Sequence, residues 1–338
     1  MREPAFWYRP RSFTSYALQP LALLYGAITE RRMVRKGADA GIPVICVGNY
    51  HVGGAGKTPT VLALARLLRE LGETPVVLSR GYGGRLEGPV MVDLERHTAA
   101  DIGDEPLMMA RDVPVAVARD RLDGAALAKS QGATVILMDD GFQNPRLLKD
   151  ASLIVIDSER GLGNGNVFPA GPLRVPLKAQ LGRTDALVLI GDGRAANDVA
   201  AELAKRDKPE LRAHLKPVAA SLAQLSGKRV FAFAGIGDPE RFVRTLRASG
   251  IDVARTRAFA DHHMFSNEEL AALAVEAQRE QLTLVTTEKD LARLRGREGV
   301  PDGIVSFAVQ LEFDEPAKLR QLISDHLYRA RERRFSAR

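Results

Sequence analysis

Short apolar runs alternate with helical stretches along the chain from Ile42 onward. The runs IPVICVG, TPVVLS, PVAVA, TVILMDD and LIVID each have the length of a strand, and a helix is expected from Thr58 to Leu71. Strands covered on both faces are apolar without alternation, and strands that alternate with helices form parallel sheets. The pattern therefore predicts an α/β fold with a mostly parallel sheet and helices on both of its faces.

Residues 161–176, with the sequence GLGNGNVFPAGPLRVP, interrupt this pattern. Their composition fits neither periodicity, so we interpret them as a linker or an active-site loop. Beyond them the alternation resumes with ALVLIG, RVFAFAGIG, IDVARTRAF and LTLVTTEKD, and helices are expected from Pro239 to Ala248 and from Asn267 to Glu280. We predict one α/β domain over residues 37–160 and a second, smaller α/β domain with a C-terminal helix over residues 161–338.

The first 36 residues have a different character. Aromatic residues come first, an apolar helical stretch follows, and the segment ends in the basic residues Arg31, Arg32, Arg35 and Lys36. This order is typical of a helix that lies in a membrane interface. A signal peptide or a plain packing helix would explain parts of it, although no clear cleavage site follows. No segment has the roughly 18 apolar residues of a membrane-spanning helix, so we expect the chain not to cross a bilayer.

Composition narrows the classes of function. With 338 residues, 45% of them hydrophobic, the chain can bury a large core. Its single cysteine, Cys46, lies in the apolar run PVICV and can form no internal disulfide, which fits a cytosolic compartment. The net charge is +6, and basic clusters near both ends would suit lipid phosphates or nucleic acid, or would simply be solvated helix ends. With one tryptophan and no recognised binding motif, nucleic acid is a remote partner, and no obligate protein partner is indicated.

Residues 47–60, VGNYHVGGAGKTPT, form the strongest local signal, a strand that ends in a glycine-rich turn and then opens a helix. In such a P-loop, backbone N–H groups surround phosphate oxygens, the lysine reaches the β- and γ-phosphates, and the hydroxyl that follows can ligate magnesium. The usual first glycine of the motif falls at His51, so the match is incomplete. The predicted nucleotide-binding residues are Gly53, Gly54, Ala55, Gly56, Lys57, Thr58 and Pro59.

Two acidic segments are candidates for the chemistry. TVILMDDGFQ places Asp139 and Asp140 at the carboxyl end of a buried strand, where carboxylates can hold Mg²⁺ together with Thr58. Paired aspartates also cap turns, but the upstream P-loop favours the magnesium interpretation. Asp104, in GDEP, precedes a helix and would ordinarily be a cap, yet phosphoryl transfer to an alcohol benefits from a carboxylate that accepts the proton.

The segment FADHHMF places Asp261, His262 and His263 together after a predicted strand. An Asp–His pair can tune or relay a proton. Adjacent histidines would also suit a metal, but no zinc-type spacing accompanies them. Either histidine alone would be interpreted as a structural or surface residue.

Together, the segments GNYHVGGAGKTP, SRGYGG, GDEP, DDGFQ, GNGNVFPAGPLR, AGIGDPERF, FADHH and TTEKD resemble the tetraacyldisaccharide 4′-kinase family of lipid A biosynthesis, over roughly residues 5–295. This succession is far more specific than a P-loop alone. The resemblance implies that ATP and Mg²⁺ phosphorylate the 4′-hydroxyl of a tetraacyldisaccharide 1-phosphate. It also implies a peripheral enzyme on the cytoplasmic face of the bacterial inner membrane, with the lipid near the N-terminal helix and a second domain that closes over the nucleotide.

The resemblance also implies roles for single residues. Asp104 would be the base that acts on the sugar hydroxyl, and His262 would orient or assist it as the second member of a dyad. Lys57 would serve the phosphates, and Thr58, Asp139 and Asp140 would serve phosphate and magnesium. Further candidates for binding substrate or phosphate are Arg80, Arg121, Asn49 and Gln143.

The chain departs from the family pattern at two positions. His51 stands where a small polar residue is frequent, and Asn144 follows DDGFQ where a histidine is common. Two other functions also fit the residues: a P-loop kinase or ATPase with a soluble substrate, and a non-catalytic nucleotide-dependent membrane switch. The first would leave the aromatic N-terminus without a role, and the second would leave Asp104 without a proton to accept.

Overall fold

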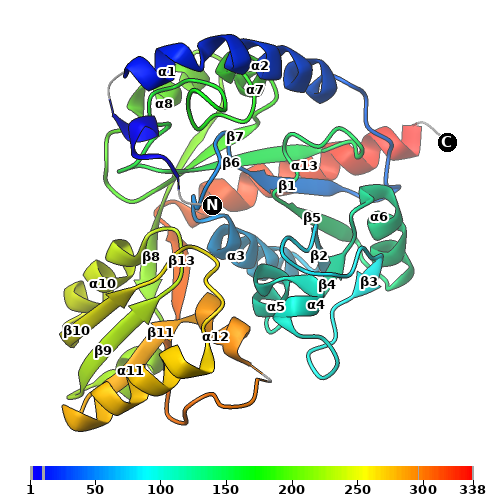
Figure 1. Ribbon diagram of the computed structural model, residues 1–338. Helices are drawn as coiled ribbons and strands as arrows, with labels where there is room; N and C mark the ends of the chain where they lie inside the picture. Colours follow the sequence, from blue (N-terminus) through cyan, green and yellow to red (C-terminus); the bar gives the residue numbers. More distant parts are fainter. Residues whose placement is uncertain (1–2, 10–11, 296, 337–338) are drawn as a thin grey trace.

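The computed structural model describes residues 3–9, 12–295 and 297–336, and these form two β-sheets (Figure 1). The larger sheet has nine strands in the order β13-β8-β7-β6-β1-β5-β2-β4-β3. Neighbouring strands are parallel except in the edge pairs β13–β8 and β4–β3. Its strands are β1 (Val44–Gly48), β2 (Pro75–Ser79), β3 (Val90–Met91), β4 (Val115–Val117), β5 (Val135–Asp139), β6 (Ala151–Asp157), β7 (Ala186–Ile190), β8 (Glu210–Pro217) and β13 (Val309–Phe313). The predicted parallel-rich α/β fold is confirmed.

Helices cover both faces of this sheet. One face packs against α3 (Lys57–Glu70), α5 (Asp104–Met109) and α13 (Pro316–Ser336). The other packs against α2 (Gln19–Met33), α6 (Arg121–Ser130), α7 (Leu177–Leu181) and α8 (Asn197–Ala204). In β1, Ile45 and Val47 belong to the first core and Val44 and Cys46 to the second. Because every residue of this strand is buried, its sequence is apolar throughout.

The smaller sheet has four parallel strands in the order β10-β9-β11-β12. They are β9 (Arg229–Ala234), β10 (Asp252–Ala258), β11 (Thr283–Thr287) and β12 (Val305–Phe307). One core includes residues of α9 (Ala219–Leu225) and α10 (Pro239–Ala248), and the other includes residues of α11 (Asn267–Arg279) and α12 (Glu288–Leu294). Helices α10 and α11 occupy the two segments where the apolar pattern predicts helices.

The smaller sheet is inserted into the chain that forms the larger one. Strand β8 leaves the larger sheet at Pro217, and β13 returns to it at Val309. We call residues 218–308 the inserted unit and the other described residues the P-loop unit. The change of sheet therefore falls after residue 217, and residues 161–176 connect β6 to α7 within the P-loop unit. Composition misplaced this boundary because β7 and β8 resemble any other strand, and a local pattern does not tell which sheet a strand joins.

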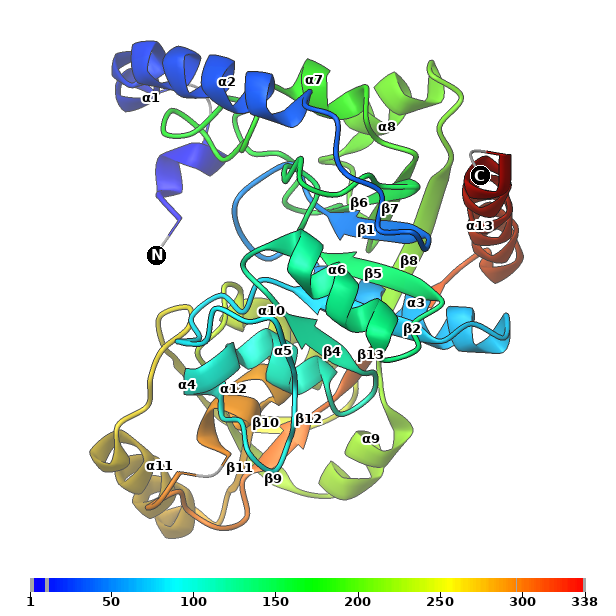
Figure 2. The same cartoon turned by 90° about the vertical axis from the view of Figure 1, so that its right-hand side faces the viewer.

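The N-terminal elements are η1 (Ala5–Tyr8), α1 (Phe13–Ala17) and α2, and α4 (Ala99–Ile102) is a further short helix. Figures 1 and 2 show α1 and α2 along one rim of the molecule, away from the inserted unit. Trp7 is buried and its indole N–H donates to the carbonyl of Pro169 at 3.1 Å, so η1 is tied to the loop that precedes α7. Within the described ranges, no helix has both the length and the apolar character needed to cross a membrane.

Candidate active site

The glycine-rich loop between β1 and α3 has the geometry of a phosphate site. Gly56 precedes α3 as its N-cap with a φ of 85°, and Gly53 has a φ of 113°, so both need the left-handed region that glycine tolerates. The 14-residue α3 points its free N–H groups and the positive end of its dipole at this loop. Residues 53–59, the predicted nucleotide-binding residues, all lie in the loop and the first turn of α3.

Side chains behind the loop hold its backbone. The Asn49 side-chain amide donates to the carbonyl of Gly53 at 3.1 Å. Gln143 donates to the Asn49 carbonyl at 2.7 Å and to the Gln180 side chain at 2.9 Å, and Gln180 in turn donates to the Tyr50 carbonyl at 3.2 Å. The structure therefore places Asn49 and Gln143, two candidates for substrate contact, in a network that supports the P-loop.

His51, where the motif usually has glycine, is buried in the loop and only 1% exposed. Its backbone forms an isolated bridge with Leu173, which connects the P-loop to the loop of residues 161–176. Burial, followed by the charges of Lys57, Arg160 and Arg174, lowers the pKa of the imidazole to about 3. The side chain is therefore neutral at physiological pH and adds no charge to the phosphate site.

Asp139 and Asp140 lie beside the P-loop because β5 and β1 are neighbours. Asp139 is 3% exposed, and its Oδ1 has no hydrogen-bond partner among the described residues. Burial, with the charges of Glu105 and Asp140, raises its pKa. Asp140 lies 3.7 Å from the ammonium of Lys57, and although burial opposes ionisation, Lys57 and Arg174 hold its pKa below the ordinary value.

Two arginines, Arg174 and Arg121, lie near these carboxylates, and Arg80 lies near Arg121. Arg174, from the loop of residues 161–176, donates to Asp140 at 3.0 Å and to the His51 carbonyl at 3.1 Å. Arg121 is 2% exposed at the start of α6 and donates to the carbonyl of Ala118. Burial lowers the pKa of the Arg121 guanidinium, and the negative charge of Asp139 offsets only part of this effect. Arg80 is exposed just beyond β2, and its charge also reaches Arg121.

Asp104 and His262 meet between the two units. Asp104 is 6% exposed at the start of α5 and accepts a hydrogen bond from the Nδ1 position of His262 at 3.1 Å. Burial opposes its ionisation, but the hydrogen bond with His262 and the charges of Lys289 and Arg293 outweigh burial and hold its pKa below the ordinary value. From the SRGYGG segment, the Tyr82 ring lies edge-on to the His262 ring at 5.8 Å.

The neighbouring histidine, His263, contacts residues of the inserted unit. His263 Nε2 lies 2.8 Å from the carboxylate of Glu269, and its ring stacks on Phe259 at 4.8 Å. Of the two adjacent histidines, His262 is the one in contact with Asp104. Within the described ranges, no group of three or more His, Cys, Asp or Glu side chains is arranged to hold a metal.

Further ion pairs join the two units around this site. Lys289 of α12 pairs with Glu105 at 2.9 Å, next to Asp104. Arg241 of α10 pairs with Asp157 at the end of β6, and Arg244 lies 3.6 Å from Glu159. The candidate site is thus bounded by the carboxyl ends of the parallel strands and by the inserted unit, which is where ligands bind in open α/β sheets.

Two charged residues of the site are absent from the site residues that the sequence predicts. Arg174 is one arginine in a loop that the pattern could only describe as a linker or an active-site loop, and the GPLR segment is its single clue. Arg293 of α12 is buried and contacts Asp104, although 189 residues separate them. Their partners are distant in sequence, so spacing alone does not find them.

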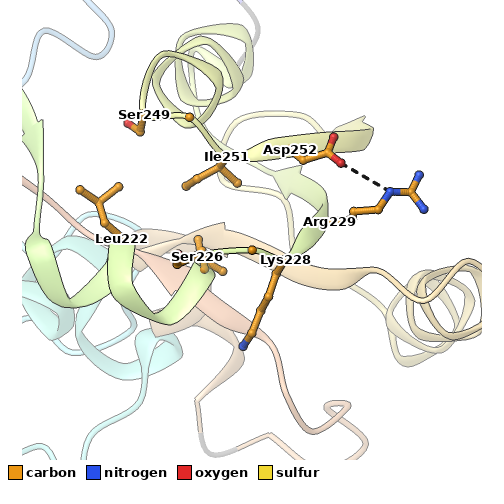
Figure 3. A pocket seen from close by; sticks show the side chains of 10 residues that line it. Leu222, Ser226, Lys228, Arg229, Ser249, Ile251 and Asp252 are labelled. Carbon is orange, nitrogen blue, oxygen red and sulfur yellow. Dashed lines mark ion pairs between the residues drawn. The ribbon is translucent and has the colours of Figure 1, made fainter.

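Two surfaces away from this site complete the picture. A pocket of about 360 Å³ lies in the inserted unit between α9 and the start of β10, lined by Leu222, Ile251 and the pair Arg229–Asp252 (Figure 3). It contains none of the predicted site residues. The basic C-terminal helix α13 is paired internally, since Arg331 contacts Glu73 at 2.6 Å and Arg334 contacts Asp150 at 3.0 Å.

Comparisons with known proteins agree with this geometry. The family described as tetraacyldisaccharide-1-P 4′-kinase matches residues 14–328. The tetraacyldisaccharide 4′-kinase of Bradyrhizobium diazoefficiens is 87% identical over 338 residues and that of Rhodopseudomonas palustris strain CGA009 is 64% identical over 339, each across the full length of both chains. A crystal structure from Aquifex aeolicus, described as the "apo" form of this kinase in complex with ATP, is similar at a TM-score of 0.71 and 29% identity, covering 93% of this chain and 99% of that one. The chain therefore belongs to the tetraacyldisaccharide-1-P 4′-kinase family and is a kinase.

Proposed function

We propose that the chain transfers the γ-phosphoryl group of ATP to the 4′-hydroxyl of a tetraacyldisaccharide 1-phosphate at the junction of its two units. The observation that carries this proposal is the Asp104–His262 contact, because it brings a carboxylate and an imidazole from different units to the carboxyl ends of the strands that bear the P-loop. Glu105, the next residue after Asp104, is close enough to raise the pKa of Asp139 beside the P-loop. The base and the nucleotide site thus adjoin.

The P-loop unit binds and orients ATP. N–H groups of residues 53–58 surround the phosphates, and Lys57 neutralises charge at the transferred group. In this structure the Lys57 ammonium lies 3.7 Å from the Asp140 carboxylate, and the Arg174 guanidinium lies 3.0 Å from it. Arg121 and Arg80 add positive charge at the rim, where the 1-phosphate of the acceptor or the phosphates of ATP would be attracted. These arginines are proposed to orient the two phosphorylated reactants.

Asp104 is proposed to accept the proton of the 4′-hydroxyl. Its lowered pKa keeps it ionised at physiological pH, so it is always ready to accept, although it is a weak base. A weak base suffices, because in a loose phosphoryl-transfer transition state there is little bond formation to the acceptor oxygen. His262 is proposed to orient the carboxylate through the 3.1 Å contact between its Nδ1 and Asp104 Oδ2.

The carboxylates beside the P-loop fit a magnesium ion that arrives with the nucleotide. Asp139 offers a buried oxygen without a hydrogen-bond partner among the described residues, and Thr58 lies in the first turn of α3. Mg²⁺ in kinases is held by one or two carboxylates together with substrate phosphates, so two aspartates and a threonine are an adequate protein contribution. When bound, the ion would neutralise charge that develops on the phosphates. Asp139, Asp140 and Thr58 are the residues proposed to hold it.

The rim formed by α1 and α2 is proposed to dock on the membrane that carries the acceptor. Its exposed large apolar and aromatic side chains are Phe13, Tyr16, Leu21, Leu23, Leu24, Tyr25 and Ile28. Exposed apolar side chains grouped on a helix next to basic residues are typical of an interfacial helix, and Arg31 and Arg32 lie in the last turn of α2. We therefore propose that the enzyme is peripheral and lies on the cytoplasmic face of the bacterial inner membrane.

A transfer assay and a vesicle assay test the two parts of this proposal. With labelled ATP and tetraacyldisaccharide 1-phosphate in micelles, label is expected in a bisphosphorylated lipid. Release of phosphate alone, or transfer to a soluble sugar instead, would show that the lipid is not the acceptor. Flotation with anionic vesicles is expected to recover the wild-type chain, and a Leu23→Ser, Leu24→Ser variant is expected to float poorly. Val275→Ser, which changes an equally exposed apolar residue on α11, is the matched control.

A further inference from the structure

A buried arginine of the inserted unit contacts the proposed base. Arg293 lies on α12 and is 4% exposed. Toward the P-loop unit, its Nε donates to Asp104 Oδ2 at 2.7 Å, and its Nη2 lies 2.6 Å from the same oxygen. Within the inserted unit, its Nη1 contacts the carboxylate of Asp290 at 2.5 Å and the carbonyl of Gly235 at 2.8 Å. One guanidinium therefore joins the P-loop unit to two elements of the inserted unit.

These contacts divide the two oxygens of Asp104 between different tasks. Oδ2 accepts a hydrogen bond from Arg293 Nε, forms a charge contact with Arg293 Nη2, and is contacted by the Nδ1 of His262. Among the described residues, Oδ1 accepts a hydrogen bond only from the backbone N–H of Glu105, at 2.9 Å. A carboxylate oxygen has two lone pairs, so Oδ1 retains the capacity to accept a proton from an alcohol. Arg293 thus holds one oxygen of the carboxylate in place and leaves the other available.

We propose that Arg293 is the positioning residue of the base: it holds Asp104 Oδ2 so that Oδ1 faces the acceptor, and does so only while the inserted unit is docked on the P-loop unit. This inference rests on the proposed role of Asp104 as the base. Arginine suits the task because its planar fork contacts both carboxylates and the Gly235 carbonyl at once, whereas the single ammonium of a lysine cannot reproduce this geometry.

The charges around Asp104 determine what loss of Arg293 would do. His262, Lys289 and Asp261 face it from the inserted unit together with Arg293 and Asp290, and Glu105 is its neighbour on α5. Without Arg293, Lys289 is the cation that remains beside the His262 contact, and Asp290 loses the partner that separates it from Asp104. The Asp104 carboxylate would be less strongly held ionised and free to rotate, so both its orientation and its proton affinity would change.

The test compares Arg293→Met with Arg293→Lys and with the control Arg247→Met, which removes an exposed arginine from α10 of the same unit. For Arg293→Met we expect kcat to fall by roughly 100-fold, the cost typical of a misplaced catalytic group, with the KM for ATP nearly unchanged. We also expect the acid limb of the kcat–pH profile to move to higher pH, because the pKa of Asp104 rises when the cation is removed. Arg293→Lys is expected to keep the acid limb near the wild-type position but to lose much of kcat.

A purely structural role for Arg293 would lower the amount of active enzyme equally at every pH. An unmoved acid limb in Arg293→Met, or full kcat in Arg293→Lys, would therefore overturn the proposal, and the lysine variant decides the matter if the methionine variant does not fold. In an Asp104→Asn background, Arg293→Met is expected to cause no further loss, and multiplied losses would also overturn it. Full activity of Asp104→Asn alone would instead show that the proposed base is wrong.

Discussion

The buried imidazole of His51 predicts a specific acid sensitivity of the P-loop unit. The pKa of His51 is lowered to about 3, chiefly by burial, whereas an exposed histidine in the unfolded chain has a pKa of 6.5. Between these values the unfolded chain binds a proton that the folded chain does not. Protonation then favours the unfolded state, so the stability of the folded chain falls as the pH falls below 6.5.

The magnitude follows from this difference. At pH 5 the His51 side chain of the unfolded chain is almost fully protonated. Between pH 7.5 and pH 5 this protonation lowers the free energy of unfolding by about 2 kcal/mol. This value barely depends on the folded pKa, provided that the folded pKa is below about 4. His51→Asn removes the titrating group. Between pH 7.5 and pH 5, the free energy of unfolding of the variant should therefore fall by about 2 kcal/mol less than that of the wild type, whatever its absolute stability.

Urea denaturation at pH 7.5 and pH 5 measures this effect. The single tryptophan, Trp7, is buried against the P-loop unit, and its fluorescence reports the unfolding of that unit. His97→Asn, which replaces a half-buried histidine outside the P-loop, shows what any histidine substitution contributes. Equal losses of stability in the wild type and His51→Asn, or an NMR titration of the His51 ring near pH 6.5, would refute the reasoning.

Three further substitutions test other parts of the structure. Gly56→Ala should weaken ATP binding, measured by calorimetry, at least about tenfold, because the φ of Gly56 is 85° and the new Cβ would lie 2.3 Å from an Ile190 methyl. Gly72→Ala is the control for backbone strain alone, since Gly72 has a φ of 79° but open space around it. Arg174→Met should also weaken ATP binding, since it frees Asp140 to repel the phosphates, and unchanged affinity would contradict this. Arg334→Met should lower the free energy of unfolding by about 1–3 kcal/mol without changing kcat, because Asp150 loses one of its ionic partners far from the site.

Local patterns in the sequence predict the elements of this fold better than their assembly. The strand, glycine turn and helix of the P-loop are encoded within residues 44–70 and form as the apolar pattern predicts. The return of β13 to the larger sheet is not local: Val309 pairs with Pro217 across the whole inserted unit. A strand pattern gives no information about such a partner, which is why the boundary between the units was misplaced.

The site shows the same limit. Asp139 and Asp140 follow a buried strand, so their position beside the P-loop follows from the pattern. The contact between Asp104 and His262 spans 158 residues and was expected only because the segments resemble a known family. Arg293 is one of 48 lysines and arginines and was not predicted, since its burial depends on carboxylates from both units. Gln143, a candidate for binding substrate or phosphate, donates to the carbonyl of Asn49 behind the P-loop, a contact that the pattern does not predict.

The proposed mechanism depends on Asp104, which is proposed to accept the proton of the lipid hydroxyl during phosphoryl transfer. The most direct measurement is a single-turnover transfer of labelled γ-phosphate from ATP to tetraacyldisaccharide 1-phosphate in micelles, with the wild type and Asp104→Asn at matched ATP occupancy. Asp104→Asn is expected to bind ATP normally but to form the bisphosphorylated lipid at least about 100-fold more slowly, the scale of general-base catalysis. Transfer by Asp104→Asn at the wild-type rate would show that Asp104 is not the base.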